Sequence, residues 1–470
     1  MQIEVEGRLM WRSDVPRVDG FSQKCGLLVM SWLNKDIFEN EAERLSLPAG
    51  ADRRWVARRK SGNVNPNPEN RILDRRSAEN VNDRLEKASH RWDQVSSFHR
   101  YGRLVQSSAS ASVVCHGKPK IMLGSNNYLG LTDHPKVKEA AIKATEKYGT
   151  GAGGVRLLSG TMDLHRELEE KLAAFKGMEA CHIFTSGYVA NYAAMTALVE
   201  KGDVAFNDQV NHASIIDGCR ASEGIIRFYK HKDVANLERK LAAYESNRNK
   251  IIITDGVFSM DGDIAPLKEL HLLAKKYNAI LVVDDAHATG VIGPQGRGTA
   301  EHCGILGKVD VTIATLSKSL GAVGGAVCGS RALIKTMFHK SRPFIFSSAL
   351  PPAVAATVIA ALDVIRMEPQ LIARLHQNSL FLGEGLRKIG YNAIPSPTAI
   401  IPIIIGDEVK TYRLATMLDE MGVFVNAVSR PAVPRELSRL RVSVMATHTP
   451  VQLLEALSLF EKAGKTLRLI

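Results

Sequence analysis

The sequence contains no hydrophobic stretch long enough to span a membrane. A spanning helix needs roughly 20 mostly apolar residues, whereas the longest apolar runs, such as Ile400 to Ile405, have the length of a strand. The amino-terminal residues lack the apolar core of a signal peptide, because charged residues recur from Glu4 to Asp19. We therefore expect a protein without a membrane span, located in the cytoplasm.

Cysteine is scarce, and its positions exclude the usual metal and disulfide patterns. The chain has 6 cysteines in 470 residues, with no CxxC pair and no histidine cluster that would complete a zinc site. We expect a reducing compartment and no bound metal. The six are Cys25, Cys115, Cys181, Cys219, Cys303 and Cys328.

A long basic block is also absent. Lys and Arg outnumber Asp and Glu by 61 to 49, which gives a formal charge of +12, but the basic residues are scattered. They form no run interleaved with aromatic residues, as a nucleic-acid interface would. A solvated basic surface is the simpler interpretation, and we expect no nucleic-acid partner.

The chain divides by composition into an extension and two domains. Residues 1–95 alternate short apolar pieces with Arg-rich and turn-rich segments such as SGNVNPNPEN at 61–70, which predicts an amino-terminal extension and linker. Residues 96–365 alternate short apolar strands with amphipathic helices, which favours a largely parallel α/β sheet covered on both faces. Residues 366–470 predict a smaller α+β domain that ends in a helix from about Pro450.

The strand and helix patterns of this large region are distinct enough to be placed. Apolar runs at Cys181–Thr185, Ile251–Thr254, Ile280–Asp284 and Val311–Thr315 predict strands, and Leu164–Phe175 and Leu267–Tyr277 predict helices. In the carboxy-terminal part, Ile400–Ile405, Val423–Asn426 and Leu440–Val444 predict strands.

Two polar motifs follow apolar strands. Lys318 lies in TLSKSLG, where a desolvated amine could form a Schiff base. Taken alone, such a lysine would more often be an ordinary loop lysine. Asp284 and His287 lie in LVVDDAHATG, where a strand-end carboxylate needs a positive partner such as a protonated pyridine nitrogen. The alternative is an aspartate that caps a turn.

Two further motifs lie at expected helix starts. FTSGYVAN places Gly187 and Tyr188 where free backbone amides can bind a phosphate, although a Ser-Gly turn before a helix is common. NHAS places His212 in a strand-to-helix loop, where its ring could stack on an aromatic cofactor or simply begin the helix.

The order and spacing of these pieces resemble the α-oxoamine synthases, which are pyridoxal-phosphate enzymes. The similarity runs from about residue 95 to 465, and residues 1–90 have no recognised counterpart. The segments that carry it are SNNYLGL (125–131), GTGAGGVRLLSGT (149–161), TSGYVAN (185–191), NHASIIDG (211–218), DGVFSMDGD (255–263), DDAHATGVIGPQGRG (284–298), TLSKSLGAVGG (315–325) and RLRVSVMATHT (439–449).

The resemblance implies a fold and a reaction. The fold is that of fold-type I pyridoxal-phosphate transferases, with a mostly parallel seven-stranded sheet and a smaller carboxy-terminal domain. The reaction is the condensation of glycine, alanine or serine with an acyl thioester, with loss of carbon dioxide, to give an α-amino ketone. The acyl carrier is coenzyme A or an acyl-carrier protein, and the enzyme is expected to be a homodimer with a shared active site.

The resemblance also implies roles for single residues. Lys318 would bind the cofactor covalently, Asp284 would face the pyridine nitrogen, and His212 would stack on the ring. The remaining roles fall to phosphate, ring-oxygen and substrate contacts. His287 and Ser259 would contact the ring oxygen O3′, and Gly187, Tyr188 and Thr315 would contact the phosphate. Ser347 and Ser348 would contact the phosphate bound to the second subunit. Asn126 would line the substrate entrance, and Arg441 would hold the amino-acid carboxylate.

One departure bears on the branch of the family. Where biotin-pathway members carry Arg-Pro-Pro-Thr-Val-Pro, this chain has SRPAVP at 429–434, with Ala432 in place of threonine. This weakens a biotin-pathway assignment, and GVRLLSGT and MATHT look closer to glycine C-acetyltransferase and serine palmitoyltransferase. The rivals are another fold-type I enzyme, such as an aminotransferase or carbon–sulfur lyase, and a catalytically silent subunit, against which Lys318 argues.

Overall fold

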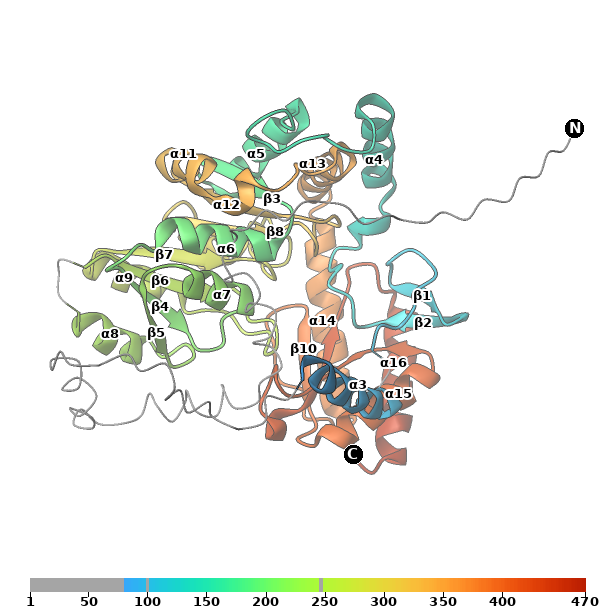
Figure 1. The fold of residues 1–470 in the computed structure, drawn as a ribbon. Helices are drawn as coiled ribbons and strands as arrows, with labels where there is room; N and C mark the ends of the chain where they lie inside the picture. The colour runs from blue at the N-terminus through green and yellow to red at the C-terminus, as the bar shows by residue number, and fades with distance from the viewer. Residues whose placement is uncertain (1–79, 99–100, 245–247) are drawn as a thin grey trace, which may run out of the picture. The chain divides into compact units, whose positions relative to one another are not determined.

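The computed structural model describes residues 80–98, 101–244 and 248–470. Val81–Ile470 forms one compact unit. Most of the predicted extension, residues 1–79, lies outside the described residues. The last part of it, together with the next three residues, forms helix α3 (Val81–Phe98), which lies beside α15 (Glu408–Glu420) in Figure 1.

A seven-stranded sheet is the centre of the large region. Its strands are β3 (Ala180–Phe184), β9 (Gly325–Gly329), β8 (Val311–Thr315), β7 (Ala279–Asp284), β6 (Lys250–Asp255), β4 (Val204–Asp208) and β5 (Ile225–Tyr229), in that order across the sheet. Only β9 runs antiparallel to its neighbours. The mostly parallel seven-stranded sheet expected from the sequence is therefore confirmed.

Helices cover the sheet on both faces (Figure 1). Since every residue of β4, β6, β8 and β9 is buried, these strands read as continuous apolar runs rather than alternating ones. The helices of this region are α4 (Pro135–Tyr148), α5 (Asp163–Lys176), α6 (Gly187–Leu198), α7 (Ala213–Ala221), α8 (Val234–Ala242), α9 (Leu267–Lys276), α10 (Thr299–His302), α11 (Arg331–Lys340), α12 (Arg342–Ile345) and α13 (Pro352–Met367).

The carboxy-terminal part has its own antiparallel sheet and core. Strands β10 (Ile400–Ile404), β13 (Arg439–Ser443) and β12 (Asn426–Val428) pair in that order. Helices α14 (Gln370–Lys388), α15 and α16 (Pro450–Thr466) pack with this sheet around a second apolar cluster. This arrangement confirms the predicted smaller domain with a final helix.

A third sheet ties the amino-terminal arm to this smaller domain. β1 (Ser112–Cys115) and β2 (Lys118–Met122) form a hairpin, and β11 (Val423–Phe424) pairs parallel with β2. The strand predicted at Val423–Asn426 is therefore two short strands, β11 and the start of β12, which belong to different sheets. The arm also places residues 123–128 along β13, because Ser443 donates its N–H to the carbonyl of Leu123.

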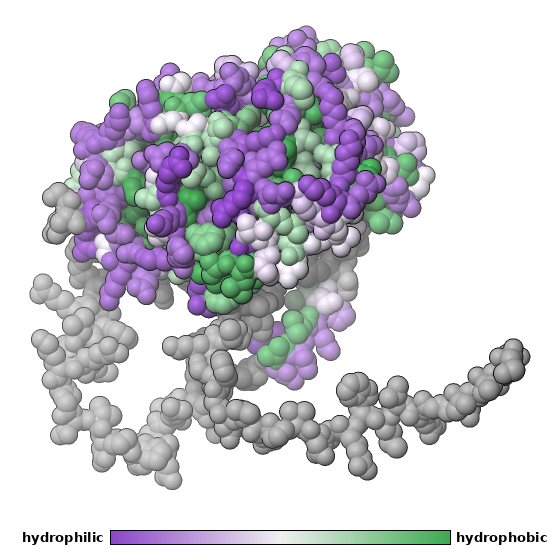
Figure 2. All heavy atoms as spheres, turned by 90° about the horizontal axis from the view of Figure 1, so that it is seen from above, coloured by the Kyte–Doolittle hydropathy of each residue, from purple (hydrophilic) through white to green (hydrophobic). Residues whose placement is uncertain are grey.

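The face in Figure 2 is mostly hydrophilic, with apolar side chains between charged ones. This appearance agrees with a solvated surface. Among the described residues, none of the helices combines the length and hydropathy that a membrane crossing requires.

Candidate active site

The candidate site is built at the carboxyl ends of the parallel strands. β6 ends in Asp255, β7 in Asp284 and β8 in Thr315. The strand register pairs Asp255 directly with Asp284, so the two aspartates lie side by side at one edge of the sheet. Ligands of open α/β sheets bind at this edge.

Asp284 is held by hydrogen-bond donors on both oxygens. Its Oδ2 accepts from Asn191 Nδ2 at 2.6 Å, and its Oδ1 accepts from the backbone N–H of Ala286 at 2.9 Å. Donors on both sides favour the ionised carboxylate. Burial and the neighbouring charge of Asp284 raise the pKa of Asp255 well above its usual value, so Asp255 is held protonated. The hydrogen bonds therefore favour Asp284 as the charged member of the pair.

Lys318 lies in the loop after β8, at the same edge. Burial lowers the pKa of its amine to about 8, although the negative charge of Asp284 acts in the opposite direction. An amine with this pKa loses its proton readily near neutral pH. That property is what a lysine needs to bond to an aldehyde.

The start of α6 packs directly against the end of β8. Ser186 caps the helix by accepting the N–H of Val189 at 3.1 Å, which leaves Gly187 and Tyr188 in the first turn. A Cβ on Gly187 would lie only 2.9 Å from Thr315 Oγ1, so glycine is required for this approach. First-turn amides and the Thr315 hydroxyl together form a place for a phosphate.

The Tyr188 side chain points to a different partner. Its hydroxyl donates to Asp217 on α7, and burial together with that carboxylate raises the pKa of Tyr188 to about 12. A phosphate contact by Tyr188 would therefore come from its backbone amide.

His212 is both the N-cap of α7 and part of the site. Its Nδ1 accepts the backbone N–H of Ser214 at 3.3 Å and lies 2.7 Å from the Ser214 hydroxyl. The residue is exposed, yet partial loss of solvation lowers the pKa of His212 below its usual value. The negative charge of Asp284 raises this pKa, and the positive charge of Lys318 lowers it. The interpretation of His212 as a helix-start residue is therefore confirmed, and its stacking on the cofactor ring stays a prediction.

His287 is buried next to a tyrosine that the sequence analysis left without a role. Tyr128 Oη lies 2.7 Å from His287 Nδ1 and accepts from Arg441 Nη2 at 3.3 Å. Because guanidinium can only donate, the tyrosine hydrogen can go either to His287 Nδ1 at 2.7 Å or to Asn126 Oδ1 at 3.3 Å, and the shorter contact favours His287. Burial and the positive charges of Lys318 and Arg441 lower the pKa of His287, which favours the neutral ring. A neutral ring that accepts the tyrosine hydrogen on Nδ1 carries its own hydrogen on Nε2.

Arg441 contacts Asn126, the other predicted substrate residue, and Ser259, which was predicted to contact the ring oxygen of the cofactor. Its Nε donates to the Ser259 carbonyl at 2.6 Å, and both terminal nitrogens lie 3.2 Å from Asn126 Oδ1. The guanidinium is thus held in place by backbone and side-chain acceptors. A substrate carboxylate would take over the acceptor position that Asn126 holds.

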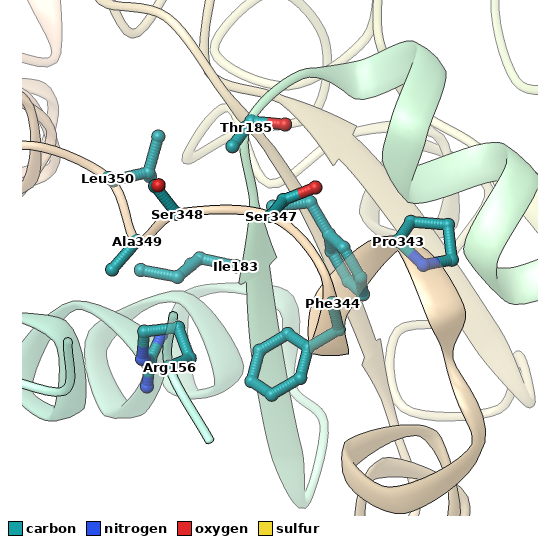
Figure 3. A pocket seen from close by; sticks show the side chains of 10 residues that line it. Arg156, Ile183, Thr185, Pro343, Phe344, Ser347, Ser348, Ala349 and Leu350 are labelled. Carbon is teal, nitrogen blue, oxygen red and sulfur yellow. The ribbon is translucent and has the colours of Figure 1, made fainter. Parts of the chain in front are cut away.

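Ser347 and Ser348 line a small pocket at the end of β3 (Figure 3). Thr185 and the buried Arg156 line it as well, and Arg156 is engaged by Glu169 in a two-bond ion pair at 2.9 and 3.0 Å. Ser348 bridges to Val155, so this segment lies against the loop at 149–161. The serines remain candidates for phosphate contact across a subunit interface.

Four polar residues at the site were missed as functional candidates: Tyr128, Asn191, Ser214 and Asp255. Each lies inside a motif that carried the family resemblance. The available signal was a lone amide among alanines on the buried face of α6, in YVANYAAM, because an unpaired amide there would be costly.

The residues present fit pyridoxal phosphate. The amine of Lys318 can bond to its aldehyde, Asp284 can face its pyridine nitrogen, and His287 Nε2–H can face its ring oxygen. The gap at Gly187, which a side chain would close, suits the phosphate. No cluster of metal-ligating side chains occurs among the described residues.

Comparison with known proteins agrees with this chemistry. The family model for aminotransferase class I and II matches residues 118–460. The 8-amino-7-oxononanoate synthase of Thermoanaerobacter pseudethanolicus is 48% identical over 368 residues, which cover 78% of this chain and 93% of that protein.

Two solved structures extend the comparison. A serine palmitoyltransferase structure with its pyridoxal-phosphate internal aldimine has a TM-score of 0.79 at 34% identity, and the match covers 82% of this chain and 98% of that one. An 8-amino-7-oxononanoate synthase from Francisella tularensis has a TM-score of 0.64 at 29% identity, covering 75% and 99%.

Proposed function

Because the chain belongs to the aminotransferase class I and II family, and within it to the α-oxoamine synthases, we propose that it joins alanine to a seven-carbon acyl thioester that ends in a carboxylate. This proposal is based on the structure of 8-amino-7-oxononanoate, the compound after which the relatives are named. In 8-amino-7-oxononanoate, the last two carbons correspond to alanine after loss of its carboxyl group, and the first seven to a dicarboxylic acyl group.

The family activity itself is pyridoxal-phosphate-dependent condensation with decarboxylation. When bound, the cofactor supplies an electron sink for the carbanion at the amino acid's α-carbon. The Lys318 amine would take the α-proton, since its pKa of about 8 lets it act as a base near neutral pH. Asp284 would keep the pyridine nitrogen protonated.

The other residues bind and orient. Arg441 would hold the carboxylate of the amino acid through its planar guanidinium. His287 Nε2–H would donate to the ring oxygen of the cofactor, and His212 would lie against its ring. The amides of Gly187 and Tyr188, with the Thr315 hydroxyl, would hold the phosphate.

Condensation of serine with a long acyl chain is the second candidate. The higher structural similarity to serine palmitoyltransferase favours it, as does Ala432 in SRPAVP. The relatives of highest identity among those compared are nevertheless named 8-amino-7-oxononanoate synthase, so Ala432 alone does not separate the branches.

The experiment is a matrix of glycine, alanine and serine against acetyl, pimeloyl and palmitoyl thioesters of coenzyme A. Released thiol and product mass are measured, with Lys318→Ala as the inactive control. We expect alanine with the pimeloyl thioester to give the highest kcat/KM. Highest activity with serine and the palmitoyl thioester would establish the second candidate instead, and repeating the best pair on acyl-carrier protein identifies the carrier.

We also propose a homodimer with a shared site. Phe346, which is 71% exposed, precedes Ser347, and Leu158, which is 82% exposed, lies in the adjoining loop. Large apolar side chains exposed beside a candidate phosphate site are suited to a subunit interface. Sedimentation should give a dimer, and an active monomer would contradict this.

The cytoplasmic location stays a prediction, to be checked by cell fractionation.

A further inference from the structure

We propose that Asn191 and Ser214 are positioning residues that connect Asp284 to His212 and determine which ring nitrogen of His212 carries hydrogen. The inference rests on the proposed use of Asp284 and His212 at the cofactor. Asn191 lies on the buried face of α6, and Ser214 lies in the first turn of α7. These two helices pack against each other and bring both side chains to the end of β7.

The hydrogen bonds form a continuous chain. Asn191 Nδ2 donates one hydrogen to Asp284 Oδ2 at 2.6 Å and the other to Ser214 Oγ at 2.9 Å. Ser214 Oγ in turn lies 2.7 Å from His212 Nδ1. Four residues from three separate segments of the chain are thereby linked.

The direction of each bond follows from what the groups can donate. A reversed Asn191 amide would put its oxygen against the carboxylate of Asp284, so the amide nitrogen must face that side. Ser214 Oγ accepts from Asn191, which leaves its own hydrogen for His212 Nδ1. The backbone N–H of Ser214 points to the same nitrogen at 3.3 Å.

His212 therefore has two donors at Nδ1 and must carry its hydrogen on Nε2. That orientation presents an N–H to the site, where it can donate to an oxygen of the substrate. The opposite tautomer would present a lone pair and repel a carboxylate. Ser214 thus determines whether His212 presents a hydrogen-bond donor or an acceptor to the substrate.

Asn191 shows that this arrangement is maintained at a cost. Its Oδ1 is buried and has no hydrogen-bond partner within the described part of the chain. A buried carbonyl without a partner is unfavourable. The amide accepts this cost because both of its hydrogens are used, one on Asp284 and one on Ser214.

Several titratable groups face His212 and bear on its protonation. Asp284 lies at the end of β7, Lys318 in the loop after β8, and Asp217 on α7 itself. Asp255, at the end of β6, accepts the backbone N–H of His212 at 3.5 Å. Because these groups stay in place in a Ser214→Ala variant, a change in the His212 tautomer there reports on the hydroxyl.

The first test reads the tautomer directly, on the cofactor-bound protein without substrate. Histidine labelled with 15N is observed by NMR, and His212→Gln assigns the resonances. In the wild type we expect the Nδ1 resonance of an unprotonated nitrogen; a protonated Nδ1 would overturn the proposal. In Ser214→Ala we expect a shift toward a mixture of tautomers, and an unchanged spectrum would also overturn it.

The second test measures exchange of the alanine α-proton with deuterated water, which needs no acyl donor. We expect Asn191→Ala to retain the cofactor but to exchange about tenfold more slowly, because one hydrogen bond to a charged group is lost. Exchange at the wild-type rate in Asn191→Ala would count against the proposal. An inactive wild type would instead count against the proposed function, while the NMR result would still decide the tautomer.

Matched controls separate this role from general packing. Asn378 and Ser379 are a buried amide and a buried hydroxyl on α14, bonded to the carbonyls of Met445 and Thr398. Asn378→Ala and Ser379→Ala should lower the melting temperature without changing the His212 tautomer or the exchange rate. If they altered both as strongly as the site variants do, the effect would be structural and the proposal would fail.

Discussion

Replacing Asp284 by asparagine should affect the protein more than the loss of one charge suggests. The carboxylate accepts from Asn191 on one oxygen and from the Ala286 N–H on the other. An asparagine has one acceptor oxygen, so its amide nitrogen must face one of these donors. Asp284→Asn therefore removes the partner of the pyridine nitrogen and leaves a buried donor without an acceptor.

The size of the effect can be worked out from these contacts. A hydrogen bond to a charged group contributes about 1.5 to 3 kcal/mol, and a buried unpaired donor costs about 1 to 3 kcal/mol. Since the N–H group of Asn191 is buried and that of Ala286 is partly buried, we expect the cofactor-free variant to be about 2 to 4 kcal/mol less stable. A rise of about 3 kcal/mol in the barrier to proton removal corresponds to a roughly hundredfold slower rate.

The assay follows exchange of the α-proton with deuterated water, which isolates proton removal from acyl transfer. His287→Asn is the comparison, because it removes a hydrogen-bond partner of the ring oxygen and no charge partner of the nitrogen. We expect Asp284→Asn to be slower than His287→Asn by at least tenfold. Exchange by Asp284→Asn at the wild-type rate would show that Asp284 is not the partner of the pyridine nitrogen.

Three further predictions concern other parts of the structure. Attachment of the cofactor to the apoprotein should become faster as pH rises through about 8, because Lys318 reacts only when deprotonated; an acidic midpoint in stopped-flow absorbance would contradict this. Tyr128→Phe removes the hydrogen donor of His287 and should cost about 1 to 3 kcal/mol in unfolding free energy and raise KM for the amino acid; unchanged melting and kinetics would refute the contact. Deleting residues 1–79, which keeps α3 intact from Val81, should leave condensation nearly unchanged, and loss of cofactor binding would place those residues in the folded enzyme.

The sheet was predictable because its strands are locally encoded. Runs such as Ile251–Thr254 and Val311–Thr315 are apolar on both faces, which only a doubly covered parallel strand needs. The antiparallel β9 and the order of the strands are not local properties, and the expected sheet rested on the resemblance. The β1–β2–β11 sheet was not predicted, since β11 pairs with a strand some 300 residues away.

The site was predictable only where a residue's type is unusual for its position. A lysine after a buried strand, or an aspartate at its end, stands out because burial of a charge is costly. Asn191 and Tyr128 do not stand out in this way, because an amide or a phenol can be buried when it is paired. Their roles depend on partners such as Ser214 and Arg441, which the fold brings from distant segments.

The two histidines of the site each have a hydroxyl next to Nδ1, supplied by unrelated elements of the fold. A serine hydroxyl lies on Nδ1 of His212, and a tyrosine hydroxyl lies on Nδ1 of His287. Reduced solvation and the positive charge of Lys318 lower the pKa of both rings, so both stay neutral. A neutral Nε2–H can donate to a developing anion without adding a positive charge that would compete with the pyridine nitrogen for Asp284. The charge of Asp284 is thereby kept for the pyridine nitrogen of the cofactor, and the other positions around the cofactor ring are met by uncharged hydrogen-bond donors.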